Sequence, residues 1–508
     1  MCRGTIPKSG LDTLTLKLDL FLCNGIIKLV INLKYILIVL AVIIVFFVIL
    51  TVNALIKKSS ARKLGAEIIH KTRPEQEAYA LRLGEMIRCK TISSKDSYDD
   101  TEFLKLRTVM EELFPLVHSR CERMIFGDDC WMYRLQGRDT GRNIMVMSHH
   151  DVVDATGEWK HPAFCGEIFE DALWGRGTVD TKTPLFAEFQ ALEELLAEGF
   201  VPECNLYIGS SHNEEVSGNG IPLALRYFEE NGITFEAILD EGGAVIDPPL
   251  AGMKCKCAMM AVHEKGFHKI ICTAGEGSYH TGLAANTNTP VARMSAFIAE
   301  VNSKNIFVRR LYPQVKAMFE SLSPYTPFPM QLLFSNLWCF GGLLKTVMPK
   351  VNPQAGAMTG TSCSFTEITS SREDKNCVAT AMLRCVDDKD LEKDLQAIEN
   401  IAKKYGISIK PAEGNEYHAP ADMSLPAYSY ARKCAEEIFP NVAVAPYILP
   451  AGTDARHFSD ICRCVIRFAP IEMDSQQFAS VHSENENISL KAIGNAVAFY
   501  RSYIKNYK

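Results

Sequence analysis

The feature that most constrains the fold is a series of short apolar runs that alternate with helical stretches. Three runs, 143–147, 206–209 and 235–239, have the length and composition of buried strands. The stretches 184–198 and 222–230 lie between them, and each begins with a proline and is followed within two residues by a glycine. Strands that alternate with helices in this way predict a largely parallel, three-layer α/β sheet.

Acidic and histidine residues stand at the ends of these runs. The side chains concerned are His149 and Asp151 after the first run, Glu214 and Glu215 after the second, and Asp240 after the third. Asp180 follows a glycine-rich turn, and His482 lies in a polar loop near the C-terminus. Because ligands of open α/β sheets bind beyond the carboxyl ends of the strands, we expect these side chains to converge.

So many carboxylates are costly to bury together unless cations neutralise them, which predicts a shared metal site. Mixed histidine and carboxylate ligands suit zinc, with manganese or cobalt possible on ligand type alone. None of the intervals has the short spacing of a zinc finger, which favours a catalytic site assembled by the fold. Any one of these residues alone would more often be a capping or salt-bridged surface residue; their joint placement favours metal.

Six segments in order resemble the motifs of one enzyme family. They are 148–153 (SHHDVV), 175–182 (GRGTVDTK), 213–215 (NEE), 239–243 (LDEGG), 452–456 (GTDAR) and His482. Together they resemble the di-zinc family that includes aminoacylase, carboxypeptidase S and succinyl-diaminopimelate desuccinylase. The resemblance covers most of 76–504.

The resemblance implies a zinc-exopeptidase type of catalytic domain that holds two zinc ions. His149 and Asp240 would hold one ion, Glu215 and His482 the other, and Asp180 would bridge them. We assign His149 rather than its neighbour because the family motif is His-x-Asp.

The resemblance also implies the roles of two further acidic residues. Asp151 would orient the imidazole of His149 through its second nitrogen. Glu214 would be the general base, which takes a proton from the metal-activated water and passes it to the leaving nitrogen.

The pattern of predicted strands and helices changes at about residue 262. Strands are predicted at 267–273, 362–368 and 378–385, and helices at 290–301 and 390–405. This inserted α+β unit, 262–411, resembles the lid or dimerisation domain of the family, which implies a homodimer. The catalytic domain would then comprise 57–261 and 412–508.

Four residues are candidates for contact with the substrate. His280, within 275–282, resembles the lid histidine that stabilises the reaction oxyanion, although a satisfied surface or core histidine fits as well. Arg384, at the end of a lid strand, is a candidate for binding a substrate carboxylate, and a solvated surface arginine is the alternative. Gly452 and Arg456 would either line the substrate pocket or belong to a tight turn.

The N-terminal region contains the one membrane-spanning candidate of the sequence. After a tail, 1–34, residues 35–56 carry no charge and as a helix would reach about 33 Å. A cleaved signal peptide is the competing interpretation, but the stretch is long for one and no small-x-small cleavage site follows it. Residues 61–91 read as mostly helix with a break at Pro74.

Charge and cysteine content restrict the partners and the compartment. A net charge of −6 and a pI near 6.1 do not indicate the basic surface that nucleic-acid-binding proteins carry, so nucleic acid is not an expected partner. The 17 cysteines lack the spacing of a disulfide framework, and basic residues are denser after the apolar stretch than before it. Both features favour a membrane-anchored protein whose catalytic part is cytoplasmic.

The expected activity is hydrolysis of an amide bond. The substrate would be a short peptide, cut by a carboxypeptidase or dipeptidase, or an N-acyl amino acid. The alternative is a catalytically inactive, membrane-anchored protein of the same fold that binds peptides or acyl amino acids. The presence of Glu214 and of all five expected ligands favours the enzyme.

Overall fold

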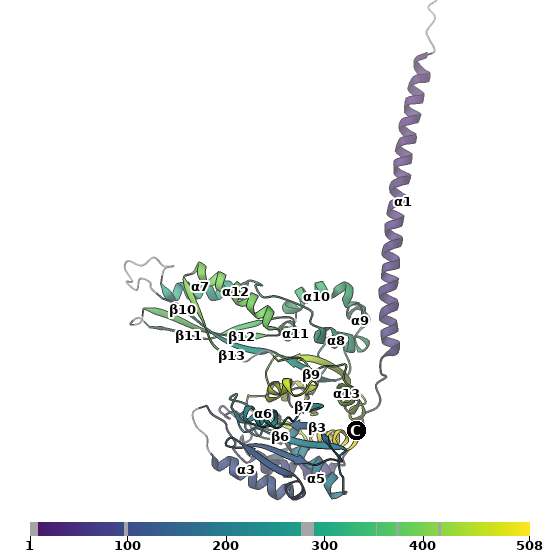
Figure 1. The fold of residues 1–508 in the computed structure, drawn as a ribbon. Helices are drawn as coiled ribbons and strands as arrows, with labels where there is room; N and C mark the ends of the chain where they lie inside the picture. Colours follow the sequence, from purple (N-terminus) through teal and green to yellow (C-terminus); the bar gives the residue numbers. More distant parts are fainter. Residues whose placement is uncertain are drawn as a thin grey trace, which may run out of the picture.

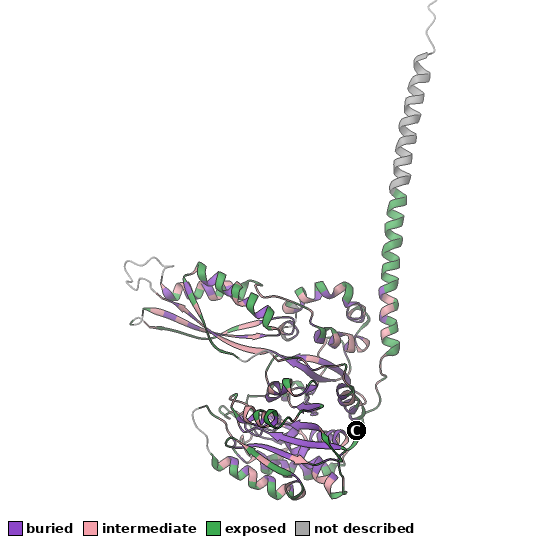
Figure 2. Ribbon diagram, in the orientation of Figure 1, coloured by how far each residue is buried: buried purple, intermediate pink, exposed green. Residues whose placement is uncertain are grey.

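The structure is a computed structural model that describes residues 9–95, 100–275, 289–351, 353–371, 373, 375–414 and 418–508. Helix α1, Ser9–Ser60, lies against the rest of the molecule at its lower end and extends away from it (Figure 1). Its segment Leu33–Ser60 is long and apolar enough to cross a membrane, and an 18-residue window within it has a mean hydropathy of 3.3. Side chains from Leu33 to Ile49 are exposed along this segment, as Figure 2 shows in green. The apolar stretch predicted at 35–56 is therefore helical, and its composition fits either a membrane anchor or a signal sequence.

The segment after α1 differs from the prediction. Residues 61–72 are not helical, and helix α2 runs from Arg73 to Ile87. Pro74 lies in the first turn of α2, where a missing N–H leaves no hydrogen bond unmade, so the predicted break at Pro74 is wrong. Glu75 accepts a hydrogen bond from the backbone N–H of Thr72 (2.7 Å), which fixes the start of the helix.

The centre of the molecule is a mixed sheet with the strand order β1-β2-β6-β3-β7-β15-β9-β14, and β8 pairs with β9. The strands are β1 Glu122–Phe126, β2 Cys130–Leu135, β3 Asp139–Met147, β6 Cys204–Ser210, β7 Ala237–Asp240, β8 Val245–Ile246, β9 Cys257–Glu264, β14 Ala443–Leu449 and β15 Val465–Arg467. The pairs β6–β3, β3–β7, β7–β15 and β9–β14 are parallel. The sheet is less parallel than predicted, because β1 and β2 add antiparallel at one edge and β15 meets β9 antiparallel.

Helices cover both faces of this sheet, which makes the three predicted layers. The helices α5 Lys182–Ala197, α6 Gly220–Glu230, α13 Pro426–Ile438 and α15 Leu490–Asn506 follow or precede strands along the chain. Val146 of β3 packs in the core with α2, α5, α13 and α15, whereas its neighbours Met145 and Met147 pack in a second cluster with α6. Alternate residues of a strand face opposite sides, so β3 is buried on both faces.

A second sheet of four antiparallel strands stands between β9 and β14 in the sequence, in the order β11-β12-β10-β13. Its strands are β10 Gly266–Ala274, β11 Ser362–Ser371, β12 Asn376–Cys385 and β13 Ile407–Gly414, and helices α7 Pro290–Ser303 and α12 Asp388–Lys404 pack on it (Figure 1). These elements confirm the three strands and two helices predicted there. We call this unit the small domain; its action as a lid stays a prediction.

The interval 304–357 contains helices that the sequence analysis did not predict. They are α8 Pro313–Leu322, α9 Phe328–Ser335, α10 Leu337–Val351 and α11 Pro353–Ala357. Val315 and Phe319 of α8 share an apolar cluster with Ala443 and Ile448 of β14, so this part of the interval packs on the large sheet. Apolar residues occur around much of α9 and α10, which hides the helical period in the sequence.

Candidate metal centre

The predicted ligands come from separate elements that end near one another. His149 follows β3, Glu215 follows β6 and Asp240 is the last residue of β7. Asp180 stands at the end of the turn before α5, and His482 lies between α14, Ser475–Ala479, and the short strand β16, Asn487–Ser489. The carboxyl ends of three adjacent strands of the large sheet thus contribute to one place.

Asp180 lies between two imidazoles. Its Oδ1 is 3.0 Å from Nε2 of His149, and its Oδ2 is 3.0 Å from Nε2 of His482. The same nitrogen of His482 is 3.1 Å from Oε2 of Glu215. Two carboxylates and two imidazoles therefore form one connected group, in which Asp180 occupies the position expected of a bridging ligand.

Asp151 contacts this group from the side of His149 that faces away from Asp180. Its Oδ1 is 3.3 Å from Nδ1 of His149, the ring nitrogen that does not face Asp180. Its two carboxylate oxygens accept the backbone N–H groups of Glu214 (3.2 Å) and Glu215 (3.1 Å). Asp151 is completely buried. The arrangement suits the orienting role predicted for Asp151.

The neighbouring imidazole of His150 points elsewhere. It stacks on the indole of Trp131 with ring centroids 4.0 Å apart, and its Nδ1 is 2.8 Å from Oγ of Ser210. His150 is buried among these groups on the other side of the strand end. The structure therefore brings His149, and not His150, to Asp180.

Charges at the site shift the ionisation of its groups strongly. Burial alone would raise the pKa of Asp180, but hydrogen bonds with His149 and His482 bring it below its usual range. Hydrogen bonds with Asp180 and Glu215 raise the pKa of His482 to about 10. Burial, and then repulsion from Asp454 and Glu215, raises the pKa of Glu214 well above its usual range.

The turn that carries Asp180 is held by a residue that the sequence analysis missed. The buried carboxylate of Glu486 accepts the backbone N–H groups of Gly177, Val179 and Asp180, at 2.6 to 3.1 Å, and the guanidinium of Arg176 at 2.7 Å. Gly177 has a φ of 92°, a conformation that glycine adopts readily. Glu486 stands four residues after His482, in a polar run with no motif to mark it.

Asp240 and Glu241 differ in what they face. The Oδ1 and Oδ2 of Asp240 accept the backbone N–H groups of Glu241 and Ala455, each at 2.9 Å. Glu241 lines the cavity described below, together with Asp180, Glu214 and His482. Burial, and then the charges of Asp180 and Asp240, raises its pKa well above the usual range. Glu241 is thus a second acidic candidate that sequence analysis did not single out.

The residues present fit divalent metal ions. Oε1 of Glu215 is buried and has no hydrogen-bond partner among the residues that the structure describes. His149, Asp180 and Glu215 each offer a ligand atom, and these atoms lie within 4.8 Å of one another. The partly buried carboxylates of Asp180, Glu214, Glu215 and Glu241 exceed the nearby imidazoles in number, and divalent cations would neutralise that excess.

A cavity of about 470 Å³ opens beside these residues. Asp180, Glu214, Glu215, Glu241 and His482 form its polar side. The remaining wall is mainly apolar and is lined by, among others, Ile246, Met259, Met358, Ile448, Ile471 and Met473. A substrate that reached the acidic group would therefore place an apolar portion against this wall.

The three predicted substrate-binding residues with described positions lie together. Gly452 lines the cavity, and a Cβ atom added to it would lie 3.4 Å from Nη1 of Arg456 and 3.7 Å from Nη1 of Arg384. Arg456 donates to the carbonyl oxygen of Thr453 (2.7 Å), and Arg384 lies over the ring of Phe267, 5.1 Å from its centroid. Two guanidinium groups thus flank one glycine, which suits an anionic substrate group. His280 lies outside the described residues.

A buried ion pair holds the loop that carries Gly452. Glu264 is paired with Nε of Arg467 at 3.1 Å, and the same carboxylate accepts the backbone N–H of Thr453 at 3.1 Å. Both side chains are almost completely buried. Sequence analysis missed this pair because the partners are far apart along the chain and neither belongs to a motif.

The sequence of this chain matches one protein-family model, peptidase family M20/M25/M40, over residues 145–506. It is 28% identical over 437 residues to the N-fatty-acyl-amino acid synthase/hydrolase PM20D1 of Xenopus tropicalis, which covers 83% of this chain and 84% of the relative. It is 28% identical over 444 residues to the probable carboxypeptidase S-like 2 of Dictyostelium discoideum, with 84% of each chain covered.

The fold also matches a solved structure. An M20 family metallo-carboxypeptidase of Sulfolobus solfataricus superimposes with a TM-score of 0.60 at 15% identity, covering 84% of this chain and 98% of the other. The family resemblance carried by the sequence motifs is thus confirmed, and the family is metal-dependent. The chain belongs to peptidase family M20/M25/M40 and is a hydrolase of the metallopeptidase type.

Proposed function

We propose that this chain hydrolyses the amide bond of N-acyl amino acids that carry a long apolar acyl group. The observation that carries the proposal is the cavity, which joins the acidic group at Asp180 to a mainly apolar wall and to Gly452 between two arginines. Such a substrate has an apolar chain, an amide and a carboxylate, and the cavity offers a matching surface for each. The similarity to N-fatty-acyl-amino acid synthase/hydrolases supports the same substrate class.

Release of a C-terminal amino acid from a short peptide is the second candidate. The same guanidinium pair would bind the peptide carboxylate, and the apolar wall would accept a large side chain. The similarity to carboxypeptidase S-like proteins supports it. Cleavage of peptides with small polar residues before the scissile bond, at rates equal to those for acyl substrates, would favour this candidate.

The residues that would hold the metal ions are His149, Asp180, Glu215 and His482, completed by Asp240 or Glu241. Zinc is the expected ion, with manganese or cobalt possible on ligand type. When bound, the ions would activate a water molecule and polarise the scissile carbonyl. Asp180, which lies between both histidines, would serve both ions.

Glu241 is the better of the two acidic candidates. Both oxygens of Asp240 already accept backbone hydrogen bonds, which tie the end of β7 to the loop at Ala455. Glu241 lines the cavity beside Asp180, where a metal ion would neutralise its charge. We therefore assign Glu241 to the metal and give Asp240 the role of holding the strand end.

Glu214 would carry the proton of the reaction. Its carboxylate lies at the cavity wall and is buried, which raises its pKa and makes it a stronger base. The backbone N–H groups of Glu214 and Glu215 donate hydrogen bonds to Asp151, which fixes the backbone that carries the Glu214 side chain. Glu214 would take the proton from water and hand it to the nitrogen of the departing amino acid.

The N-terminal helix would anchor the enzyme in a membrane. Leu50 and Ala54 of α1 are completely buried against the body, and Asn53 donates a hydrogen bond to the carbonyl oxygen of Ser335 (2.9 Å). Removing α1 as a signal peptide would uncover the face it packs on, so these contacts favour an anchor that is kept. A cytoplasmic catalytic part and a homodimer through 262–411 stay predictions, which thiol labelling of intact cells and light scattering would test.

The experiment for the proposed function uses the full chain in detergent. Elemental analysis is expected to find at least two metal ions per chain, with chelator-sensitive hydrolysis of N-oleoyl amino acids. An N-oleoyl amino acid amide, which lacks the carboxylate, is the matched substrate. Hydrolysis of the two at equal kcat/KM, or no hydrolysis of either after zinc addition, would refute the proposal.

A further inference from the structure

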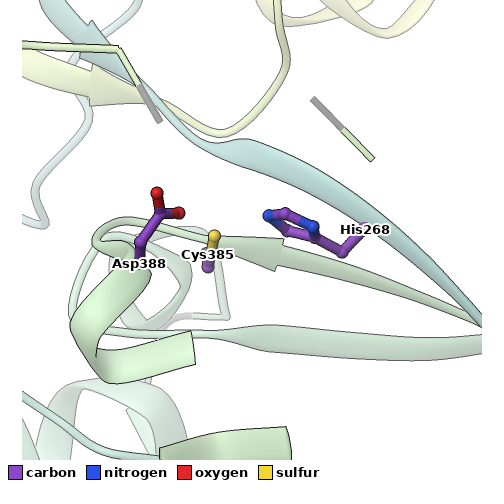
Figure 3. A group of neighbouring side chains, drawn as sticks. All are labelled: His268, Cys385 and Asp388. Carbon is purple, nitrogen blue, oxygen red and sulfur yellow. The ribbon is translucent and has the colours of Figure 1, made fainter. Parts of the chain in front are cut away.

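A second group of metal-binding side chains lies in the small domain, apart from the cavity. His268 of β10, Cys385 at the end of β12 and Asp388 at the start of α12 come together there (Figure 3). One ligand atom from each lies within 4.8 Å of the other two. None of the three lines the cavity beside Asp180.

The sheet itself brings these residues together. β10 and β12 are antiparallel, with His268 opposite Leu383, so the side chains of His268, Leu383 and Cys385 stand on the same face. Helices α7 and α12 pack on that face, and α12 begins at Asp388 three residues after Cys385. Two strands and a helix therefore hold the group, which makes it independent of any single flexible loop.

The imidazole, thiol and carboxylate of these three residues are side-chain groups that commonly bind metal ions. Nε2 of His268 is buried and has no hydrogen-bond partner within the described part of the chain, and Figure 3 shows the imidazole turned toward Cys385. Burial raises the pKa of the Cys385 thiol to about 11, so the free thiol keeps its proton. Asp388 is exposed and gives solvent access to the group. Nitrogen, sulfur and carboxylate oxygen together suit zinc.

We propose that His268, Cys385 and Asp388 bind one Zn²⁺ ion, with solvent as the fourth ligand and release of the thiol proton to water. In a tetrahedral site, zinc bonds of about 2.0 to 2.3 Å place ligand atoms about 3.3 to 3.6 Å apart, so side-chain rotations would have to bring the three ligand atoms closer together. The ion would tie the end of β12 to β10 and α12. Because Arg384 immediately precedes Cys385, the ion would also fix the strand end that carries this arginine.

Cobalt substitution tests this site separately from the catalytic centre. The purified full chain is stripped of metal and titrated with Co²⁺, and the near-ultraviolet band of cobalt bound to thiolate is recorded. The residues proposed for the catalytic centre are histidines and carboxylates, so that centre contributes no such band. We expect the band in the wild-type chain and in Cys363→Ser, whose cysteine lies on the neighbouring strand β11.

The variants that decide the matter are Cys385→Ser and His268→Gln. The first is expected to abolish the band and the second to weaken cobalt binding at least tenfold, and each is expected to hold one zinc ion fewer than wild type. An unchanged band or an unchanged zinc content in both variants would overturn the site. Failure of the catalytic centre to bind metal would leave the thiolate band in place.

A separate observation concerns helices α9 and α10, which lie beside the lower part of α1 (Figure 1). They expose large apolar side chains: the exposed fraction is 48% for Phe328, 64% for Trp338, 58% for Leu343 and 40% for Val347. We call these four residues the apolar face. Exposed apolar groups of this size gathered on two helices indicate a surface that is covered in the working protein.

Helix α1 is docked next to the apolar face. Asn336 donates to the carbonyl oxygen of Leu50 (3.0 Å), and Gln331 donates to that of Ala54 (2.8 Å). The ring of Trp338 meets that of Phe46 edge to face, with centroids 6.1 Å apart. Polar groups that would be costly in lipid are satisfied within this contact.

These contacts determine the position of the apolar face along the axis of α1. Phe46 stands ten residues before Ile56, the last residue of the uncharged stretch, which is about 15 Å along a helix. Trp338 therefore lies beside the middle of a stretch long enough to cross a hydrocarbon layer of about 30 Å.

We propose that the apolar face inserts into the same bilayer that α1 spans, which rests on the membrane anchor of the proposed function. One apolar cluster contains Leu344 and Met348 of α10 and also Met259 and Met358, which line the cavity. The membrane-facing helices and the apolar wall of the cavity are thus parts of one packed unit. Long-chain N-acyl amino acids dissolved in the bilayer would meet the enzyme at this face.

Lipid photolabelling tests the insertion without reference to activity. The full chain is reconstituted in phosphatidylcholine vesicles that contain a lipid with a photoactivatable acyl chain, and labelled peptides are mapped. We expect label in α1 and in the peptide that contains 328–351, and none at Ile368 of β11, an exposed apolar residue elsewhere. Label in α1 alone would overturn the apolar-face proposal, whereas no label in α1 would refute the anchor.

A double variant tests whether the substrate reaches the enzyme from the bilayer. Trp338→Ser combined with Leu343→Ser is expected to lower kcat/KM for long-chain N-acyl amino acids in vesicles at least fivefold. The same variant is expected to match wild type on a water-soluble N-acetyl amino acid, which excludes a folding defect. Equal kcat/KM of variant and wild type for the long-chain substrate would count against delivery from the bilayer.

Discussion

The carboxylate of Asp151 accepts the backbone N–H of Glu214 at 3.2 Å. Asp151 is also 3.3 Å from Nδ1 of His149, so one buried side chain fixes both an expected metal ligand and the expected base. If both residues have the proposed roles, this shared support would hold the base at a fixed distance from the metal.

Glu214→Gln should retain the metal content of wild type and lose nearly all turnover, since the amide has no basic oxygen to take the proton. A loss of kcat of about 10²–10⁴-fold is expected. Measurement of kcat beside elemental analysis checks this. His149→Ala is the companion variant, which should lose metal as well; substantial activity in Glu214→Gln would remove the base from the scheme.

The Glu241→Gln substitution should lower metal affinity, whereas Asp240→Asn should lower thermal stability. If Glu241 binds metal, its variant should bind metal about 10–100-fold more weakly while its melting temperature with excess zinc stays near that of wild type. Asp240→Asn should keep metal affinity and lower the melting temperature, because hydrogen bonds to Glu241 and Ala455 are weakened. Metal titration followed by thermal unfolding distinguishes the two, and the reverse pattern would return the ligand role to Asp240.

Arg384→Met should raise KM for N-acyl amino acids about tenfold to a hundredfold, the loss expected for a hydrogen bond to a charged group. The side chain keeps its length but can no longer bind a carboxylate. The matched substrate is an N-acyl amino acid amide, for which KM should hardly change. An equal increase for both substrates would show that Arg384 acts through the structure of the pocket and not through the carboxylate.

Ala451→Trp should shorten the acyl chains that the enzyme accepts. Ala451 lines the cavity and is exposed, so a large side chain can be added there without disturbing the core. We expect kcat/KM for long acyl groups to fall at least tenfold relative to that for an acetyl group. The control is Ala451→Ser, which should keep the wild-type ratio; a constant ratio in the tryptophan variant would place the acyl chain elsewhere.

Glu486→Gln should destabilise the protein by about 3–5 kcal/mol, the cost of removing one partner of a buried ion pair. Arg176 would keep a buried charge without its carboxylate, and the turn of Gly177 and Asp180 would lose its anchor. Chemical unfolding of the metal-free chain measures the loss. A variant as stable as wild type would mean that water replaces the carboxylate at this turn.

The sequence could predict the strands and most of the candidate site because both depend on local order. His149, Glu214 and Asp240 each lie within five residues after an apolar run, so the strand that precedes them also places them. The resemblance assigns Asp240 to the metal, whereas we propose Glu241; local patterns do not decide between them, because adjacent residues at a strand end point to opposite sides. Only the hydrogen bonds of Asp240 with its surroundings distinguish the two.

Two further features were beyond the reach of the sequence. Glu486 acts on residues about 310 positions earlier, and nothing in its neighbourhood marks it. Helix α9 packs partly on α1, and α10 exposes apolar side chains such as Trp338 and Leu343, so neither helix shows a clean apolar period. Both features arise from long-range contacts, which local patterns do not record.

The contact between Glu486 and the turn of Asp180 has a consequence for synthesis of the chain on the ribosome. Glu486 follows Asp180 by 306 residues in the chain, and His482, which also contacts Asp180, is translated just before it. The nascent protein can therefore build β3, β6 and β7 long before the turn of Asp180 is fixed. The proposed hydrolytic centre would be completed only after Glu486 has left the ribosomal tunnel, so a shorter nascent chain would be inactive.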